Sequence, residues 1–116
     1  MEDCIFCKIA RKEIPAEILF EDFDLVAFRD IKPIVPVHVL LIPKKHISSI
    51  NDVTEEDSAL VGKMIFRAKE LAKELGIAEG GYKLLFRTGE NGGQEVAHIH
   101  LHLLGGARLF EEIRPV

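Results

Sequence analysis

Histidine alternates with aliphatic residues in His98-Ile99-His100-Leu101-His102-Leu103-Leu104, near the C-terminus. Strict alternation predicts a β-strand with one wet face and one dry face. The three imidazoles would then share a face at intervals of about 6.5–7 Å, while the aliphatic side chains enter a core. A row of roughly 13 Å suits a phosphate with its flanking groups, and it is too long for one metal ion to bind all three rings.

Glycines flank this stretch, as Gly92-Gly93 before it and Gly105-Gly106 after it. Glycine allows the backbone to approach a ligand closely and leaves N–H groups free to point at an anion. The alternative interpretation is an ordinary polar strand face, or a tract that binds metal by chance. Exposed strand faces usually carry Thr, Lys or Glu, so the pattern favours an anion-binding site.

Composition limits the classes of protein. The chain has 116 residues, 47% of them hydrophobic and 29% charged, with a net charge of −4. These values predict one small globular domain, residues 1–116. We expect a cytoplasmic protein with no membrane partner, because the sequence has neither a signal peptide nor a run of about 18 apolar residues. Basic and acidic residues are mixed, so no long nucleic acid is expected as a partner.

The N-terminus carries a single C-x-x-C motif, formed by Cys4 and Cys7. Alone it is a weak signal for half of a zinc site, a redox pair or two unremarkable thiols. A redox pair normally follows a strand and opens a long helix, whereas here only three residues precede the motif. Zinc would need two more ligands, for which His46 and His98 are candidates.

Hydrophobic patterns predict the other elements. Strands are expected over residues 18–21, 25–29, 37–42, 82–87 and 98–104. A short helix is expected near residues 8–12, and a long one should begin at a Thr54 N-cap and end at Gly76. We therefore expect an α+β fold with an antiparallel sheet. One long helix covers one face of such a sheet, so self-association is expected to protect the rest.

The His-x-His-x-His motif with apolar spacers resembles that of the histidine triad (HIT) family of nucleotide hydrolases and transferases. The resemblance extends over nearly the whole chain, to the Hint branch of nucleoside phosphoramidases. It rests on Ile5-Phe6, Ile14-Pro15, Phe28-Arg29-Asp30-Ile31, Pro36-Val37-His38, the segment from Ile42 to Ile47, and Gly92-Gly93-Gln94. It implies a HIT-like fold, with a five-stranded antiparallel sheet, one long helix and a short N-terminal helix, assembled as a homodimer.

The resemblance also implies roles for individual residues. His100 would be the nucleophile and His102 would contact the α-phosphate and leaving group, with His98 and His38 as supporting imidazoles. Asp30 would bind the ribose and Gly93 the phosphate. The nucleobase pocket would comprise Ile5, Phe6, Ile9, Phe28, Ile31 and Leu40. Family members with an N-terminal C-x-x-C resemble zinc proteins, with ligands at Cys4, Cys7, His46 and His98.

Two positions depart from the family pattern in the nucleotide-binding loop. Arg87 stands where the phosphoramidases usually have asparagine, and Glu95 where some relatives have serine. Arg87 would add a phosphate contact or shift substrate choice toward more anionic leaving groups.

The expected activity is hydrolysis at the α-phosphate of purine nucleoside 5′-phosphoramidates or related adenylates, through a nucleotidyl-His100 intermediate. Alternatives are a purine nucleotide-binding regulatory module with little turnover, a zinc-structured interaction domain, or a dinucleoside polyphosphate hydrolase. The last belongs to the Fhit branch, which has glutamine at the position of His102.

Overall fold

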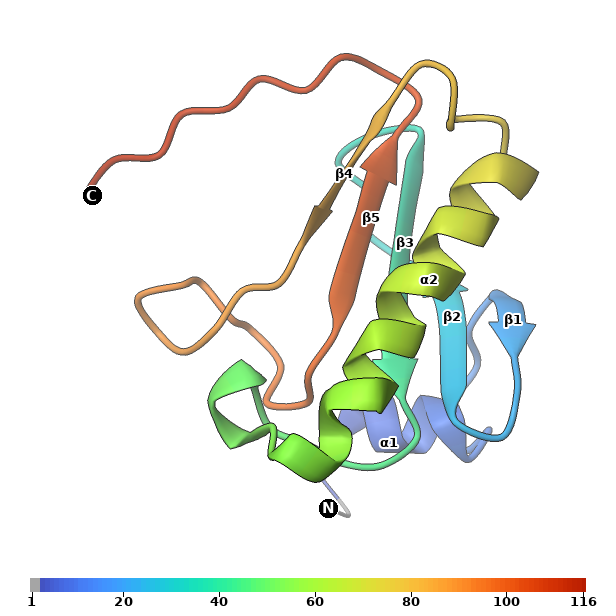
Figure 1. Cartoon of the computed structure of the whole chain (residues 1–116), viewed down its shortest axis with the longest axis vertical. Helices are drawn as coiled ribbons and strands as arrows, with labels where there is room; N and C mark the ends of the chain where they lie inside the picture. The colour runs from blue at the N-terminus through green and yellow to red at the C-terminus, as the bar shows by residue number, and fades with distance from the viewer. Residues whose placement is uncertain (1–2) are drawn as a thin grey trace.

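A computed structural model describes residues 3–116 of the chain (Figure 1). Within these residues a five-stranded sheet has the order β1-β2-β3-β5-β4, and every neighbouring pair is antiparallel. The elements in chain order are α1 (Ile5–Ala10), β1 (Ile18–Glu21), β2 (Leu25–Arg29), β3 (Val37–Pro43), the 3-10 turns Ile50–Asp52 and Glu55–Asp57, α2 (Ser58–Glu74), β4 (Tyr82–Leu85) and β5 (Leu101–Gly105). The expected α+β fold is confirmed.

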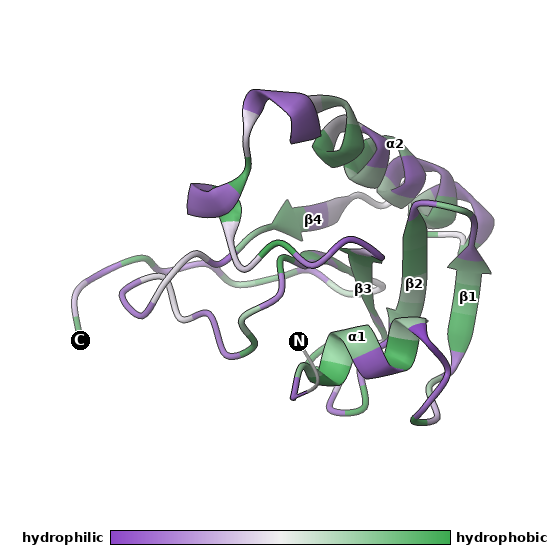
Figure 2. Ribbon diagram, turned by 90° about the horizontal axis from the view of Figure 1, so that it is seen from below, coloured by the Kyte–Doolittle hydropathy of each residue, from purple (hydrophilic) through white to green (hydrophobic). Residues whose placement is uncertain are grey.

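The helices α1 and α2 lie on opposite sides of the sheet (Figure 2). Because side chains alternate along a strand, β3 sends Val39 and Leu41 toward α2, and His38 and Leu40 toward α1. The cluster beneath α2 is purely apolar. Its buried members are Leu25, Ala27, Val39, Leu41, Met64, Ala68, Leu71, Ala72, Ile77, Leu101 and Leu103.

Helix α2 stops where the sequence predicts, but it starts later: Thr54 caps the 3-10 turn Glu55–Asp57, and the α-helix begins at Ser58. Thr54 and Asp57 form a reciprocal capping box at the preceding 3-10 turn, and Lys45 Nζ reaches the same Asp57 carboxylate at 2.6 Å. The helix ends just before Gly76, whose φ of 77° lies in the left-handed region that favours glycine.

A smaller cluster lies between the sheet and α1. It is built from Val26, Phe28, Leu40 and Ile42 of the sheet and from Phe6 and Ile9 of α1. Helix α1 is only six residues long and covers part of this face. The remainder of the face carries the candidate functional residues.

The structure corrects several predicted boundaries. The histidine stretch is not a continuous strand, because β5 begins at Leu101, so His98 and His100 precede it. The expected wet face is also wrong, since all three histidines of the triad are buried. Strand β4 ends at Leu85, and α1 begins at Ile5 with Cys4 as its N-cap, inside the C-x-x-C motif.

Residues 107–116 form neither helix nor strand, and Phe110 and Ile113 are exposed. The C-terminal segment runs away from the sheet in Figure 1. Among the described residues, no helix is long and apolar enough to cross a membrane.

Candidate active site

A cavity of about 690 Å³ opens on the face of the sheet that α1 covers incompletely. His38, His100 and His102 line it on the polar side. All of the predicted nucleotide-binding residues also line it, namely Ile5, Phe6, Ile9, Phe28, Asp30, Ile31, Leu40, Arg87, Gly93 and Glu95. The cavity therefore joins an apolar region to a cluster of imidazoles.

His100 has a defined orientation and tautomer. Its Nδ1 lies 2.8 Å from the carbonyl oxygen of His98, which only accepts, so Nδ1 carries the hydrogen. The Nε2 of a neutral His100 then keeps its lone pair. Burial lowers the pKa of His100, which favours this neutral form at pH 7. The ring packs edge-on against Phe6, with 5.0 Å between ring centroids.

His38 and His102 form a directed chain of hydrogen bonds. The Ile34 N–H donates to His38 Nδ1 at 3.3 Å, so the hydrogen of a neutral His38 is on Nε2. That nitrogen lies 3.1 Å from His102 Nδ1, which must accept. His102 then carries its hydrogen on Nε2, a buried atom with no hydrogen-bond partner among residues 3–116. The hydrogen-bond chain formed by His38 and His102 therefore ends in a donor that is unpartnered within the described residues.

Electrostatics keep this pair neutral. Burial lowers the pKa of His102 to about 4, with further contributions from His100 and His38. Burial also lowers the pKa of His38, although the nearby Asp30 carboxylate opposes that shift. At neutral pH these imidazoles act as hydrogen-bonding groups and not as acids.

Asp30 is placed by two contacts at the end of β2. Its Oδ1 accepts from the Lys32 backbone N–H at 2.8 Å, and its Oδ2 lies 3.3 Å from His38 Nε2. The sequence indicated Asp30 only as a ribose ligand. The contact with His38 also connects Asp30 to the hydrogen bond between His38 and His102.

The loop over residues 88–94 approaches the cavity through Gly93, whose φ is 78°. Gln94 clamps this loop: its Oε1 accepts from the Gly89 N–H at 2.9 Å, and its Nε2 donates to the carbonyls of Ser48 and Val96. Sequence reasoning assigned Gln94 no role. Its position directly after Gly92-Gly93 was the sequence feature that could have indicated a role for Gln94 in the loop.

Several residues that line the cavity were also missed. They are Ile14, Pro15, Ala16, Arg29, Lys32, Ile34 and Val96. Most of them lie on segments that connect the helices and strands. In such segments hydrophobic periodicity does not predict where a side chain points.

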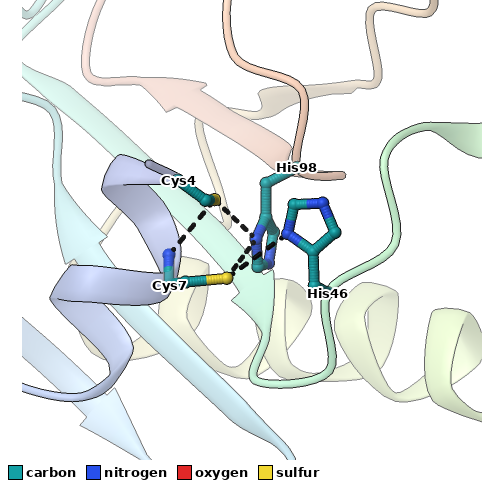
Figure 3. Close-up of side chains that lie close together, drawn as sticks. All are labelled: Cys4, Cys7, His46 and His98. Carbon is teal, nitrogen blue, oxygen red and sulfur yellow. Dashed lines mark hydrogen bonds between the residues drawn. The ribbon is translucent and has the colours of Figure 1, made fainter. Parts of the chain in front are cut away.

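Cys4, Cys7, His46 and His98 come together on the N-terminal side of the histidine stretch (Figure 3). One ligand atom from each lies within 4.8 Å of the others. The sulfur–nitrogen distances are 3.3 Å for Cys4–His98 and for Cys7–His46, and 3.5 Å for Cys7–His98. Tetrahedral Zn–S and Zn–N bonds would separate such atoms by about 3.6 Å. The cluster therefore fits a C-x-x-C zinc site.

The second ring nitrogen of His98 supports this fit. Its Nε2 lies 2.8 Å from the Pro43 carbonyl, so Nε2 carries the hydrogen and Nδ1 is free to bind a metal. Burial lowers the pKa of His98 to about 4, which keeps the ring in the neutral form that a metal requires. His98 does not line the cavity, unlike the other two triad histidines.

Comparison with known proteins agrees with this geometry. The family model described as "Scavenger mRNA decapping enzyme C-term binding" matches residues 3–110. Protein HitA of Neisseria gonorrhoeae is 50% identical over 105 residues, which are 90% of this chain and 97% of that protein. The purine nucleoside phosphoramidase of Escherichia coli K12 is 50% identical over 108 residues, covering 93% of this chain and 91% of the relative.

Solved structures match over a similar extent. A HIT family hydrolase from Legionella pneumophila superimposes with a TM-score of 0.91 at 56% identity, covering 93% of this chain and 96% of that one. A HIT family hydrolase from Clostridium thermocellum has a TM-score of 0.94 at 42% identity, covering 98% and 99%. The fold and the site thus define a hydrolase of the nucleotide-binding type. The chain belongs to the histidine triad family.

Proposed function

We propose that this protein hydrolyses purine nucleoside 5′-phosphoramidates or related adenylates at the α-phosphate, through a nucleotidyl-His100 intermediate, with residues 1–116 working as a single domain. The observation that carries the proposal is the hydrogen bonding at the cavity, which assigns opposite tautomers to His100 and His102. His100 presents a bare Nε2 and His102 presents an Nε2–H. A nucleophile next to a hydrogen-bond donor suits attack on a phosphorus shielded by anionic oxygens.

In the first step the Nε2 lone pair of His100 attacks the α-phosphorus and the P–N bond breaks. The departing nitrogen takes a proton from water. His100 becomes a positively charged nucleotidyl-imidazole, and its Nδ1–H donates to the His98 carbonyl, which stabilises that charge. Water then attacks the phosphorus, the Nε2–P bond breaks, and the nucleotide and a proton are released.

His102 acts in both steps as a donor to a non-bridging oxygen. Because its pKa is lowered to about 4, it is neutral at pH 7 and stabilises charge without giving up its proton. The amides near Gly93 add donors on the loop side of the cavity. Asp30 would bind the ribose hydroxyls, and the apolar residues around Phe28 and Leu40 would hold the base.

Zinc is the proposed occupant of the Cys4–Cys7–His46–His98 cluster, with a structural role. Two thiolates and two imidazoles complete a tetrahedral set and leave no position for substrate. The ion would tie the N-terminus to the segment whose carbonyl orients His100. A cytoplasmic location is part of the proposal, because the thiols must stay reduced to bind metal.

A homodimer is also proposed. Within residues 3–116, β4 is an edge strand, and α2 exposes Ile65 and Phe66. Unpaired strand edges and exposed aromatic side chains favour association. Light scattering on the wild type and on Phe66→Glu tests this, and a monomeric wild type would contradict it.

The deciding experiment uses adenosine and guanosine phosphoramidates, acyl-adenylates and dinucleotides with wild-type protein and with His100→Gly. We expect His100→Gly to lose turnover by at least about 1,000-fold, while it still folds and binds AMP. Labelled nucleotide should form an acid-labile adduct with the wild type only. Near-normal turnover by His100→Gly would remove the covalent mechanism. Nucleotide binding without turnover of any compound would support the regulatory module instead.

A further inference from the structure

Arg87 is an arginine without a counter-ion at the cavity. Among residues 3–116, no carboxylate lies within ion-pair distance of its guanidinium, and it takes part in no hydrogen bond. The other arginine that lines the cavity, Arg29, is paired with Glu17 at 2.7 Å. The lysines of a separate hollow, Lys44, Lys45 and Lys63, are each paired as well. No carboxylate of the described residues therefore neutralises the charge of Arg87, which can act on a ligand.

The positive charge of Arg87 acts on the phosphate end of the cavity. It lowers the pKa values of His38, His100 and His102, although burial is the larger cause in each case. Arg87 lines the same cavity as these three imidazoles, so its charge reaches the end of the cavity where a phosphate would bind.

The glycine-rich loop positions the arginine side chain. A Cβ on Gly93 would lie 3.8 Å from Arg87 Cδ, so the aliphatic stem runs along the loop. The loop itself is compact, because a Cβ on Gly92 would meet the Thr88 carbonyl oxygen at 2.3 Å. Arg87 and Gly93 line the cavity together with His100, so a group attached to a phosphate at His100 has Arg87 within the same cavity.

We propose that Arg87 is a specificity-determining residue that binds a phosphate carried by the leaving group, an inference that rests on the proposed hydrolysis. The preferred substrates are nucleotides whose leaving group bears a phosphate. A guanidinium offers parallel N–H donors that match phosphate oxygens, whereas a neutral amine gives it nothing to bind. The exposed Glu95 lies at the same cavity and would repel an anion, which places the phosphate on the Arg87 side.

A matched pair of substrates isolates this contact. Adenosine 5′-phosphoramidates of ethanolamine and of O-phosphoethanolamine share the same P–N bond and differ by one distal phosphate. We expect the wild type to favour the phosphorylated compound by about 10-fold in kcat/KM. Arg87→Gln should reduce that ratio by a similar factor, and Arg87→Lys should retain part of it. Comparing ratios between variants cancels the intrinsic reactivities of the two compounds.

Lys73→Gln is the control, because it removes one exposed positive charge from the far end of α2 and should leave the ratio unchanged. An Arg87→Gln variant that slows both compounds equally would assign Arg87 to the α-phosphate and overturn the proposal. If neither compound is hydrolysed, the proposed hydrolysis fails, and calorimetry with ADP and AMP still tests Arg87. The preference for ADP should disappear in Arg87→Gln, and an unchanged preference would overturn the proposal.

Discussion

The two faces of the sheet are built from alternate residues of the same strands, and they differ in how completely a helix covers them. Helix α2 has 17 residues and seals its face, where Leu41 is fully buried. Helix α1 has six residues and leaves a cavity beside Leu40, the next residue along β3. One face stabilises the fold, and the other retains room for a ligand.

The polar groups are distributed in the same unequal way. The cluster under α2 contains no histidine, whereas His38, His98, His100 and His102 are all buried on or near the cavity face. Burying a polar group costs free energy unless it is hydrogen-bonded. Each ring has at least one partner, which offsets much of the cost and holds the rings in defined orientations, although His102 Nε2 has no partner within residues 3–116. The comparison shows that a preorganised site and an apolar core can share one sheet.

Truncating neighbouring leucines should give the largest difference between the faces. Leu41→Ala should lower the free energy of unfolding by about 3–4 kcal/mol, because it leaves a cavity beneath α2. Leu40→Ala should cost about 1–2 kcal/mol, because that side chain already borders open space, and it should weaken AMP binding. Urea unfolding and calorimetry measure both effects. Equal costs would show that the two faces pack alike.

Removing the metal tests the cavity face alone. Cys7→Ser should abolish zinc binding and lower the unfolding free energy by about 2.7 kcal/mol if zinc is present at a hundredfold its Kd. Elemental analysis and urea unfolding provide the readouts. Wild-type protein treated with a chelator should behave like the variant, and a wild type unaffected by chelation would contradict the zinc assignment.

Replacing one glycine of the loop over residues 88–94 and one glycine of α2 by alanine compares how the two regions tolerate an added methyl group. Gly92→Ala should destabilise the protein by about 1–2 kcal/mol and lower kcat/KM, because its Cβ would clash with the Thr88 carbonyl. Gly62→Ala on α2 meets nothing within 4 Å and should stabilise by up to about 1 kcal/mol. Thermal unfolding of both variants, with turnover assays, would detect this. A loop that tolerates alanine would contradict the tight turn.

The smallest expected effect is the difference between the wild type and His38→Gln in how stability depends on pH. Burial lowers the folded-state pKa values of His38 and His102, to about 4 for His102. The unfolded chain titrates near 6.5, so it binds more protons than the folded chain below that value. Stability from these groups is therefore present above about pH 6.5 and is lost as the pH falls toward 4. Urea unfolding of wild type and His38→Gln across this range should show a shallower dependence in the variant.

Much of the fold was predictable because local signals agreed with the tertiary outcome. The β1–β2 hairpin, the capping box in the turn before α2 and the stop at Gly76 follow from turn chemistry, capping and periodicity. The histidine stretch was less predictable. Its alternation indicates a strand through His98, but β5 begins only at Leu101, and His98 instead contacts Cys4 and Cys7. Contacts between residues more than 90 positions apart override the local pattern there.

The candidate site, like the fold, was predictable from the sequence only in part. The sequence by itself determined which residue types are present: a histidine row, a glycine-rich loop and a C-x-x-C motif, and the family they resemble. The tertiary structure decided between the two roles that the sequence offered for His98, because it places this ring with Cys4, Cys7 and His46 and outside the cavity. Only the tertiary structure decided that the ring hydrogens of His100 and His102 lie on opposite nitrogens. The physical reason is that a tautomer depends on partners supplied by distant backbone and side chains, and no spacing along the chain encodes those partners.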